Sequence, residues 1–192
     1  MKMKKLKILK FALVFLALLF VIFLILDAIF PLNLSALNKS QAKILYDTDG
    51  KIIRMQLAND GIWRFHTDDV PEILKQSALL FEDKYFYYHF GVNPLAMMRA
   101  TAYNLTHKNR IGASTISMQV ARMMEPSERS YTNKIKEIFR ALQLEWHFSK
   151  DEILNFYFNL APYGGNIEGV RAAARFYFGR ELNELSYAQM AL

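Results

Sequence analysis

The segment Glu82-Asp83-Lys84-Tyr85-Phe86-Tyr87-Tyr88-His89-Phe90-Gly91 follows directly from the first helix predicted for the main domain. That helix is predicted to begin at Pro71, and its buried face is predicted from apolar residues at helical spacing: Ile73, Leu74, Ala78 and Phe81. Glu82 lies at the edge of this face. The surrounding aromatic residues should leave its carboxylate poorly hydrated, which favours use as a general base. The alternative is an acid at a helix end that pairs with Lys84 or His89.

A second polar motif begins at Gly112. On a helix that starts at Ser114, the side chains of Thr115, Gln119 and Arg122 share one narrow stripe between apolar flanks. Such a stripe suits an anionic or sugar ligand in a cleft, and free backbone N–H groups at the helix start favour phosphate. An ordinary solvated helix face is the alternative.

A third helix is predicted from Asn133 to Phe148, with two apolar stripes that indicate a largely buried helix. One stripe consists of Ile135, Ile138, Phe139, Leu142 and Trp146. The face predicted to be solvated consists of Lys136, Arg140, Gln143 and His147. Lys134 and Glu137 are predicted to form an ion pair facing an interior or a cleft; a purely structural salt bridge is the alternative. Glu137 would add a second carboxylate to Glu82, and chemistry at an anomeric carbon commonly uses two.

Two further stretches favour packing over chemistry. The Gly-rich stretch 161–174 matches no Walker or dinucleotide pattern, and its small residues predict close helix packing. Upstream, Lys43–Tyr46 and Lys51–Met55 flank a turn and predict a β-hairpin, to which 63–65 adds a third short strand. We expect this β element to act as a pedestal between a membrane and the main domain.

The N-terminal region predicts a membrane anchor. From Phe11 to Leu26 every residue is Ala, Val, Ile, Leu or Phe, and with the flanking apolar residues this run reaches the ~20 residues needed to span a bilayer. The preceding lysines place the N-terminus in the cytoplasm and all that follows Phe30 outside. A cleaved signal peptide is the alternative, but its apolar region would be shorter and would end in a small-x-small site.

Composition excludes several classes of function. The net charge is +6, but Lys2, Lys4, Lys5, Lys7 and Lys10 supply five of these charges and leave only +1 for the rest of the chain. The charge therefore forms no basic face, and no nucleic-acid partner is expected. The absence of cysteine excludes disulfides, Cys-ligated metals and thiol nucleophiles.

In this order, the motifs resemble the glycosyltransferase (transglycosylase) domain of class A penicillin-binding proteins, from near Val70 to the end of the chain. The family motif E-D-x-x-F-x-x-H-x-G is matched in full by Glu82, Asp83, Phe86, His89 and Gly91. The motif G-x-S-T-x-x-x-Q is matched in full by Gly112, Ser114, Thr115 and Gln119. The stretches 140–147 and 161–165 are most similar to the penicillin-binding protein 1C branch.

The resemblance implies a mostly α, lysozyme-like glycosyltransferase domain behind a transmembrane helix and a small β element. It implies that the domain polymerises lipid II into β-1,4 glycan strands, with inversion at the donor anomeric carbon and release of undecaprenyl pyrophosphate. Glu82 would be the general base, and Glu137 would assist pyrophosphate departure, directly or through a divalent Mg or Mn ion; no other cofactor is expected. Residues implied to bind substrate are Asp83, Phe86, His89, Gly112, Ser114, Thr115, Gln119, Arg122 and Lys134.

Two positions depart from the family pattern. Asn133 stands where the third motif, R-K-x-x-E, usually has Arg, so affinity for pyrophosphate or the rate could be lower. Arg122 stands where many members have Lys; it keeps the charge and can hold pyrophosphate through two hydrogen bonds.

The resemblance also predicts the organisation of the chain: residues 1–10 form a cytoplasmic basic tail, 11–30 a transmembrane signal anchor, 31–69 a linker with the hairpin, and 70–192 the glycosyltransferase domain. We expect a single-pass protein of the bacterial inner (cytoplasmic) membrane, with its catalytic domain in the periplasm or outside the cell. The chain stops inside a predicted helix, so the domain is expected to be incomplete. The sequence contains no transpeptidase domain, and penicillin binding is not expected.

The expected partners are lipid II, the growing glycan chain, the membrane and other proteins of cell-wall synthesis. Two alternatives are a membrane scaffold that binds lipid II without polymerising it, and a muramidase-like hydrolase. The anchor and the stripe suited to pyrophosphate argue against the hydrolase.

Overall fold

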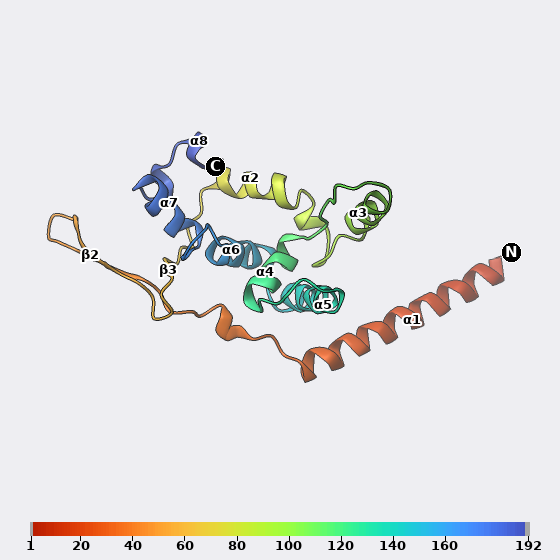
Figure 1. Ribbon diagram of the computed structural model, residues 1–192. Helices are drawn as coiled ribbons and strands as arrows, with labels where there is room; N and C mark the ends of the chain where they lie inside the picture. The colour runs from red at the N-terminus through yellow and green to blue at the C-terminus, as the bar shows by residue number, and fades with distance from the viewer. Residues whose placement is uncertain (1, 191–192) are drawn as a thin grey trace. The chain divides into compact units, whose positions relative to one another are not determined.

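The computed structural model describes residues 2–190, with side chains described from Lys7 onward. The contacts divide the chain into a first unit that ends at Asn33 and a second that begins at Leu34. In chain order (Figure 1), the elements are α1 (Lys2–Ile29), η1 (Leu34–Ala36), β1 (Lys43–Tyr46), β2 (Ile52–Gln56), β3 (Trp63–Arg64), α2 (Glu72–Glu82), η2 (Phe86–Tyr88), α3 (Pro94–Thr106), α4 (Ile116–Met124), α5 (Tyr131–His147), α6 (Lys150–Leu160), β4 (Ile167–Glu168), α7 (Val170–Phe178), η3 (Leu182–Glu184) and α8 (Tyr187–Met190).

The first unit is one long apolar helix. Within α1, Lys7–Ile29 has a mean hydropathy of 3.1 and is long and apolar enough to cross a membrane, judged by length and composition alone. A helix that is apolar on all sides is typical either of a fully buried core helix or of a membrane span. The helix predicted around Phe11–Leu26 is therefore confirmed.

The second unit is mostly helical, as predicted, and α4 lies at its centre. Figure 1 shows α4 between α5 and α6, and it packs against both of them. Most of α4 is buried, including Ile116, Met118 and Val120, each with no exposed surface. Thr115 caps the helix by accepting a hydrogen bond from the backbone N–H of Met118, so the helix begins at Ile116 rather than at the predicted Ser114. The buried helix α4 thus supports the residues of α5 on one side and those of α6 on the other.

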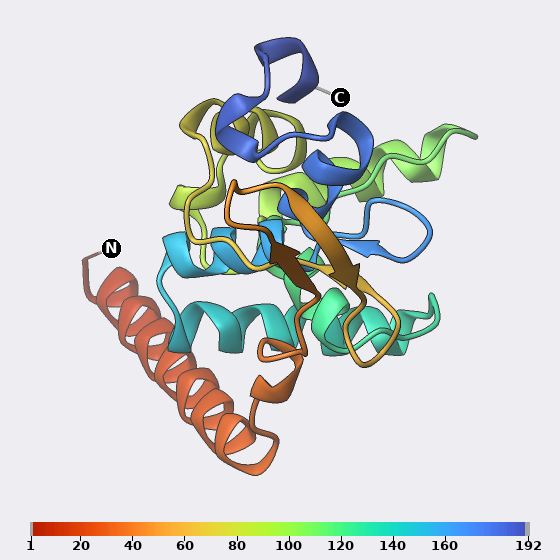
Figure 2. The same cartoon turned by 90° about the vertical axis from the view of Figure 1, so that its left-hand side faces the viewer.

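The β element is tied into the helical part of the chain. Strands β1 and β2 form the predicted antiparallel hairpin, seen side by side in Figures 1 and 2. Strand β3 pairs in parallel with β4, far along the chain. The guanidinium of Arg64 donates from Nε to Glu168 Oε1 at 2.6 Å, and the contacts group these strands with the helices in the unit that begins at Leu34.

The Gly-rich stretch between α6 and α7 packs tightly, as predicted. Gly169 has φ +88°, and a Cβ there would lie 2.9 Å from the carbonyl oxygen of Asn159. Ala172, Ala173 and Ala174 are buried on the following helix. Small side chains here allow the loop and α7 to approach α6 closely.

The predicted buried face of α2 is wrong at two positions. Phe81 is 87% exposed and Ile73 39% exposed, and no residue of α2 is fully buried. The helix lies at the surface beside a cavity, which Phe81 lines. Periodicity identified the apolar side of the helix, but that side faces open space rather than a core.

The predicted faces of α5 also need correction. Gln143 was expected in solvent but is fully buried, whereas Ile135 in the apolar stripe is 67% exposed. Gln143 accepts a hydrogen bond from Arg140 Nη1 at 2.8 Å, and Arg140 pairs with Glu125. These polar partners let α4 cover a face that looks solvated in the sequence.

Candidate active site

Glu82 is the last residue of α2, and it is exposed. Its Oε2 accepts a hydrogen bond from Gln119 Nε2 at 2.7 Å. The expectation of a poorly hydrated carboxylate is therefore wrong, because Phe81 and Tyr85 are themselves exposed and do not cover it. The alternative pairing with Lys84 or His89 is not seen either, since His89 bonds to Asp83 instead. Glu82 is an accessible carboxylate oriented by a single amide.

Buried residues beneath Glu82 fix the end of α2 to the start of α4. The carboxylate of Asp83 accepts from His89 Nε2 at 2.9 Å and from the backbone N–H of Ile116 at 3.2 Å. Thr115 Oγ1 donates to the carbonyl oxygen of Gly91 at 2.6 Å. Phe86 has no exposed surface. Of the residues implied to bind substrate, Asp83, Phe86, His89 and Thr115 thus make contacts within the protein that position Glu82.

A second buried network, which the sequence analysis missed, supports the same segment. Lys150 Nζ donates to the carbonyl oxygen of His89 and to Glu145 Oε1, both at 2.7 Å, and lies 4.3 Å from the ring centroid of Phe86. Ser117 on α4 also donates to Glu145. The side chain of Glu145 is only 3% exposed. The sequence did contain one indication of this network: Glu145 follows Leu142 by three residues, so this charged residue shares a helix face with the predicted apolar stripe.

Glu82 also lies where two cavities meet. Together with Phe81 it lines a cavity of about 660 Å³ bounded mainly by apolar and aromatic residues of α2, α6 and α7. The same two residues line a cavity of about 810 Å³ that reaches Gly112, Ser114 and Thr115. A carboxylate in this place can contact a ligand on either side.

Tyr157 is a further residue of the Glu82 side that sequence reasoning missed. It lines the more apolar cavity with Glu82. Burial raises the pKa of the Tyr157 hydroxyl to about 12, and the nearby charge of Glu82 contributes to the rise. Burial likewise raises the pKa of Tyr163, which lines the same cavity. The hydroxyl of Tyr157 is therefore held neutral next to the carboxylate.

The Glu137 side has a different character. Lys134 Nζ donates to Glu137 Oε1 at 2.6 Å and to Ser114 Oγ at 2.8 Å, which confirms the predicted ion pair. The Glu137 side chain is only 11% exposed. Lys134, Glu137 and Arg122 line a cavity of about 450 Å³. The predicted stripe on α4 therefore divides: Gln119 contacts Glu82, whereas Arg122 lies beside the ion pair.

The residues beside Glu137 do not fit a metal site built by the protein alone. Among residues 2–190, no three His, Cys, Asp or Glu side chains gather closely enough to hold an ion. The carboxylate of Glu137 already has the ammonium group of Lys134 next to it. A divalent ion there would need most of its oxygen ligands from a substrate.

Comparison with known proteins places the chain in a family. The Transglycosylase family profile matches residues 50–192. Penicillin-binding protein 1C of Escherichia coli (strain K12) is 40% identical over 169 residues, which cover 86% of this chain and 22% of that protein. Penicillin-binding protein 4 of Bacillus subtilis (strain 168) is 36% identical over 83% of this chain and 26% of its own length.

The relatives also confirm the resemblance to penicillin-binding proteins, including the 1C branch. Penicillin-binding protein 1A of Pseudomonas aeruginosa is 37% identical over 83% of this chain and 20% of its own length. The chain thus spans only about a fifth to a quarter of the length of these relatives. With most of its length matched by the family profile, the chain belongs to the transglycosylase family.

Proposed function

We propose that the chain is a peptidoglycan glycosyltransferase that polymerises lipid II, the disaccharide-pentapeptide carried on undecaprenyl pyrophosphate. One observation carries the proposal: Glu82 is exposed where two cavities meet, and Gln119 holds its carboxylate. Joining two sugars requires a base that reaches the acceptor hydroxyl at the place where the acceptor meets the anomeric carbon of the donor. Family membership supports the same reaction class.

In the proposed reaction, Glu82 takes the proton from the 4-hydroxyl of the acceptor sugar. The hydroxyl oxygen attacks the anomeric carbon of the growing chain, the new β-1,4 bond forms with inversion, and the bond to the lipid pyrophosphate breaks. Gln119 orients the carboxylate through the bond at 2.7 Å. An accessible base is suited to this role because the acceptor must enter and the extended chain must move on.

The leaving group would occupy the Glu137 side. Arg122 and Lys134 are cations that can neutralise the departing pyrophosphate, and Ser114 holds Lys134 in place. Glu137 would hold the ammonium group in position and assist departure. The two carboxylates thus take separate roles, one on the nucleophile and one on the leaving group.

The anchor suits a lipid-linked substrate. We propose that α1 crosses the bacterial inner membrane once, with the lysine-rich N-terminus in the cytoplasm and the second unit in the periplasm. Tethering at a membrane raises the local concentration of an enzyme for a substrate that is itself confined to that membrane.

Detergent-solubilised protein incubated with labelled lipid II tests the proposal. Glycan polymer formed by the native chain and lost in Glu82→Gln supports the glycosyltransferase. Lipid II binding without polymer would contradict it and favour the scaffold. Release of soluble fragments from preformed, lipid-free peptidoglycan would instead favour a hydrolase.

A further inference from the structure

The loop that joins α3 to α4 borders two cavities of the candidate active site. Residues 108–113, called the α3–α4 loop below, lie between the two helices. Arg110 of this loop lines the cavity of about 450 Å³ beside Glu137. Gly112 lines the cavity of about 810 Å³ that Glu82 also lines. The path of the loop therefore helps to set the shape of both cavities.

One side chain holds this loop in place. Residues 108–112 are exposed, and the loop contains no helix or strand. Asn104, in the last turn of α3, donates from Nδ2 to the carbonyl oxygen of Ile111 at 3.0 Å. The same side chain accepts a hydrogen bond from the backbone N–H of Ile111 through Oδ1 at 2.8 Å. Among residues 2–190, these two are the only hydrogen bonds in which the α3–α4 loop takes part.

A side-chain amide suits this task, because it carries a donor and an acceptor side by side. It pairs with both backbone groups of Ile111, as a neighbouring strand would. Ile111 is exposed, so water could satisfy the same groups, and the two bonds contribute little to global stability. Their effect is to fix the loop to α3. Without them the loop would gain conformational freedom, and a substrate would have to order it on binding.

We propose that Asn104 is a positioning residue for lipid II, because its two bonds hold the α3–α4 loop as a border of both cavities. Asn104 lines neither cavity and acts through the loop. The inference rests on the proposed function, since it explains how the binding site for that substrate is kept ordered. With the loop released, binding weakens, while Glu82 and Gln119 lie outside the loop and keep their contact.

Limited trypsin digestion of the whole detergent-solubilised chain tests whether Asn104 holds the loop. Trypsin cleaves after Lys and Arg, and the loop contains Lys108 and Arg110. Cleavage requires local opening, so Asn104→Ala should raise the rate at these two sites about three- to tenfold. Cleavage after Lys51, in the exposed turn between β1 and β2, is the internal control and should not change. Mass spectrometry of the fragments measures each rate.

The second measurement is the kinetics of polymer formation from labelled lipid II. Asn104→Ala should raise KM about three- to tenfold and leave kcat within about twofold of the native value. A general loss of structure would instead lower both kcat and the unfolding midpoint. Thr101→Ala is the matched control and should behave like the native chain. Thr101 is exposed on the same helix, and its hydroxyl donates only to the carbonyl oxygen of Met97.

A conservative variant sharpens both measurements. Asn104→Asp keeps the acceptor for the N–H of Ile111 but lacks the donor for its carbonyl oxygen. Its KM and its rate of loop cleavage should therefore fall between those of the native chain and Asn104→Ala.

Equal cleavage of the loop in the native chain and in Asn104→Ala would overturn the inference. Faster cleavage with an unchanged KM would also overturn it, because holding the loop would then have no consequence for lipid II. Failure of the proposed function looks different, since no polymer would form even from the native chain. The dissociation constant of labelled lipid II then replaces KM, and equal values for the native chain and Asn104→Ala would overturn the inference.

Discussion

The two sides of α4 hold their carboxylates in opposite ways. Glu82 is exposed and has a neutral amide as its partner, whereas Glu137 is nearly buried and paired with Lys134. Beneath Glu82 lies a frame of buried polar contacts, while Glu137 lies in a cavity lined by Arg110, Arg122 and Arg129. On the Glu82 side, the buried contacts fix the backbone that carries Glu82, whereas its carboxylate is exposed.

The two carboxylates thus differ in their access to solvent and in how firmly their partners hold them. A base that must meet a new acceptor in each cycle benefits from an open position with a fixed backbone. A group that stabilises developing charge benefits from partners already in place. The contrast can be tested by changing one side at a time.

The largest expected effect comes from exchanging each carboxylate for its amide. Glu82→Gln should lower the rate of polymer formation roughly 10²–10⁴-fold, because it removes the proton acceptor. Inorganic pyrophosphate binding should stay within about twofold of the native value, since Glu82 is not in that cavity. Glu137→Gln should lower the rate but tighten pyrophosphate binding by freeing the charge of Lys134. Weaker pyrophosphate binding in Glu82→Gln would contradict the separation of the two sides.

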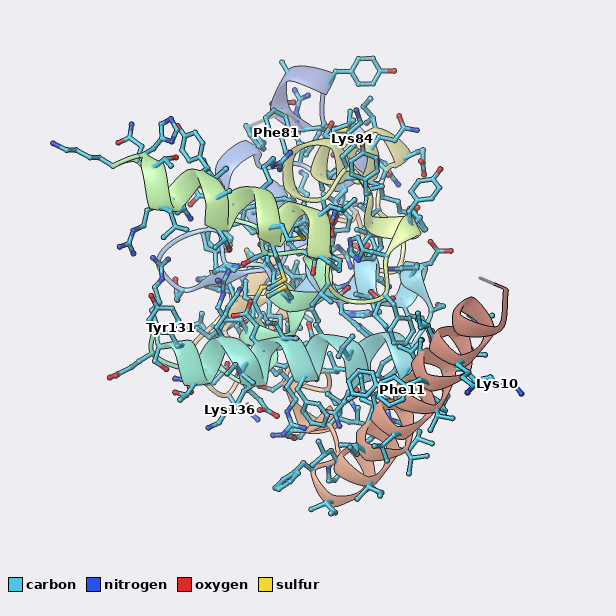
Figure 3. All side chains as sticks on the ribbon, turned by 90° about the vertical axis from the view of Figure 1, so that its right-hand side faces the viewer. Lys10, Phe11, Phe81, Lys84, Tyr131 and Lys136 are labelled. Carbon is cyan, nitrogen blue, oxygen red and sulfur yellow. The ribbon has the colours of Figure 1, made fainter. Side chains whose placement is uncertain are left out.

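The next effect concerns the frame beneath Glu82. Lys150→Met leaves buried Glu145 without its ammonium partner and the His89 carbonyl without its donor. The free energy of unfolding should fall by about 3 kcal/mol, the lower end of the cost of breaking a buried ion pair, because Lys150 is partly exposed. Lys136→Met is the control: Lys136 lies on the exposed face of α5 (Figure 3), and its loss should cost less than about 0.5 kcal/mol. Equal losses in urea unfolding would show that the network does not stabilise the frame.

A glycine pair tests the backbone of the same frame. Gly91 has φ +72°, and an added Cβ would lie 2.8 Å from the carbonyl oxygen of Ala141. Gly91→Ala should therefore destabilise the fold by about 2 kcal/mol or more, through both strain and collision. At Gly61, with φ +77° and nothing within 4 Å, the same change meets only strain and should cost about 1 kcal/mol. Thermal unfolding of both variants measures the difference, which should vanish if the contact at Gly91 can relax.

The smallest effect concerns alkaline pH on the Glu82 side. Burial raises the pKa of Tyr157 to about 12 in the folded chain, above its ordinary value of 10.0, so the folded state keeps its proton where the unfolded state loses it. The contribution to stability is present in full below pH 10 and is lost as the pH rises from 10 to 12. At pH 11 the loss should be about 1 kcal/mol after allowance for solvent screening. Tyr157→Phe should flatten this part of the curve; parallel curves for variant and native chain would contradict the shift.

Local patterns predicted much of the fold. The hairpin and the spanning-length helix depend on neighbours in the sequence, and both are present as predicted. The Lys134–Glu137 pair followed from helical spacing in the same way. The catalytic roles of Glu82 and Glu137 stay predictions, because they rest on the family motifs and not on a measured reaction.

Burial was predicted less well because it depends on distant partners. Apolar spacing predicted Phe81 and Ile135 to be buried, yet both side chains are exposed. Conversely, Gln143 is buried because Arg140 supplies a hydrogen bond. The contacts of Lys150 join segments far apart in the chain, and no local pattern records them.

The parallel pair β3–β4 has a consequence for biosynthesis. Arg64 and its partner Glu168 are 104 positions apart, so β3 waits for its neighbour until nearly the whole second unit has been translated. At about 5–20 residues per second, that delay is roughly 5–20 s. During this time the nascent chain keeps Trp63 and Phe65 without their final cover, since Ala172 of their cluster emerges later still. Chaperones that shield apolar segments would have their main opportunity in this interval.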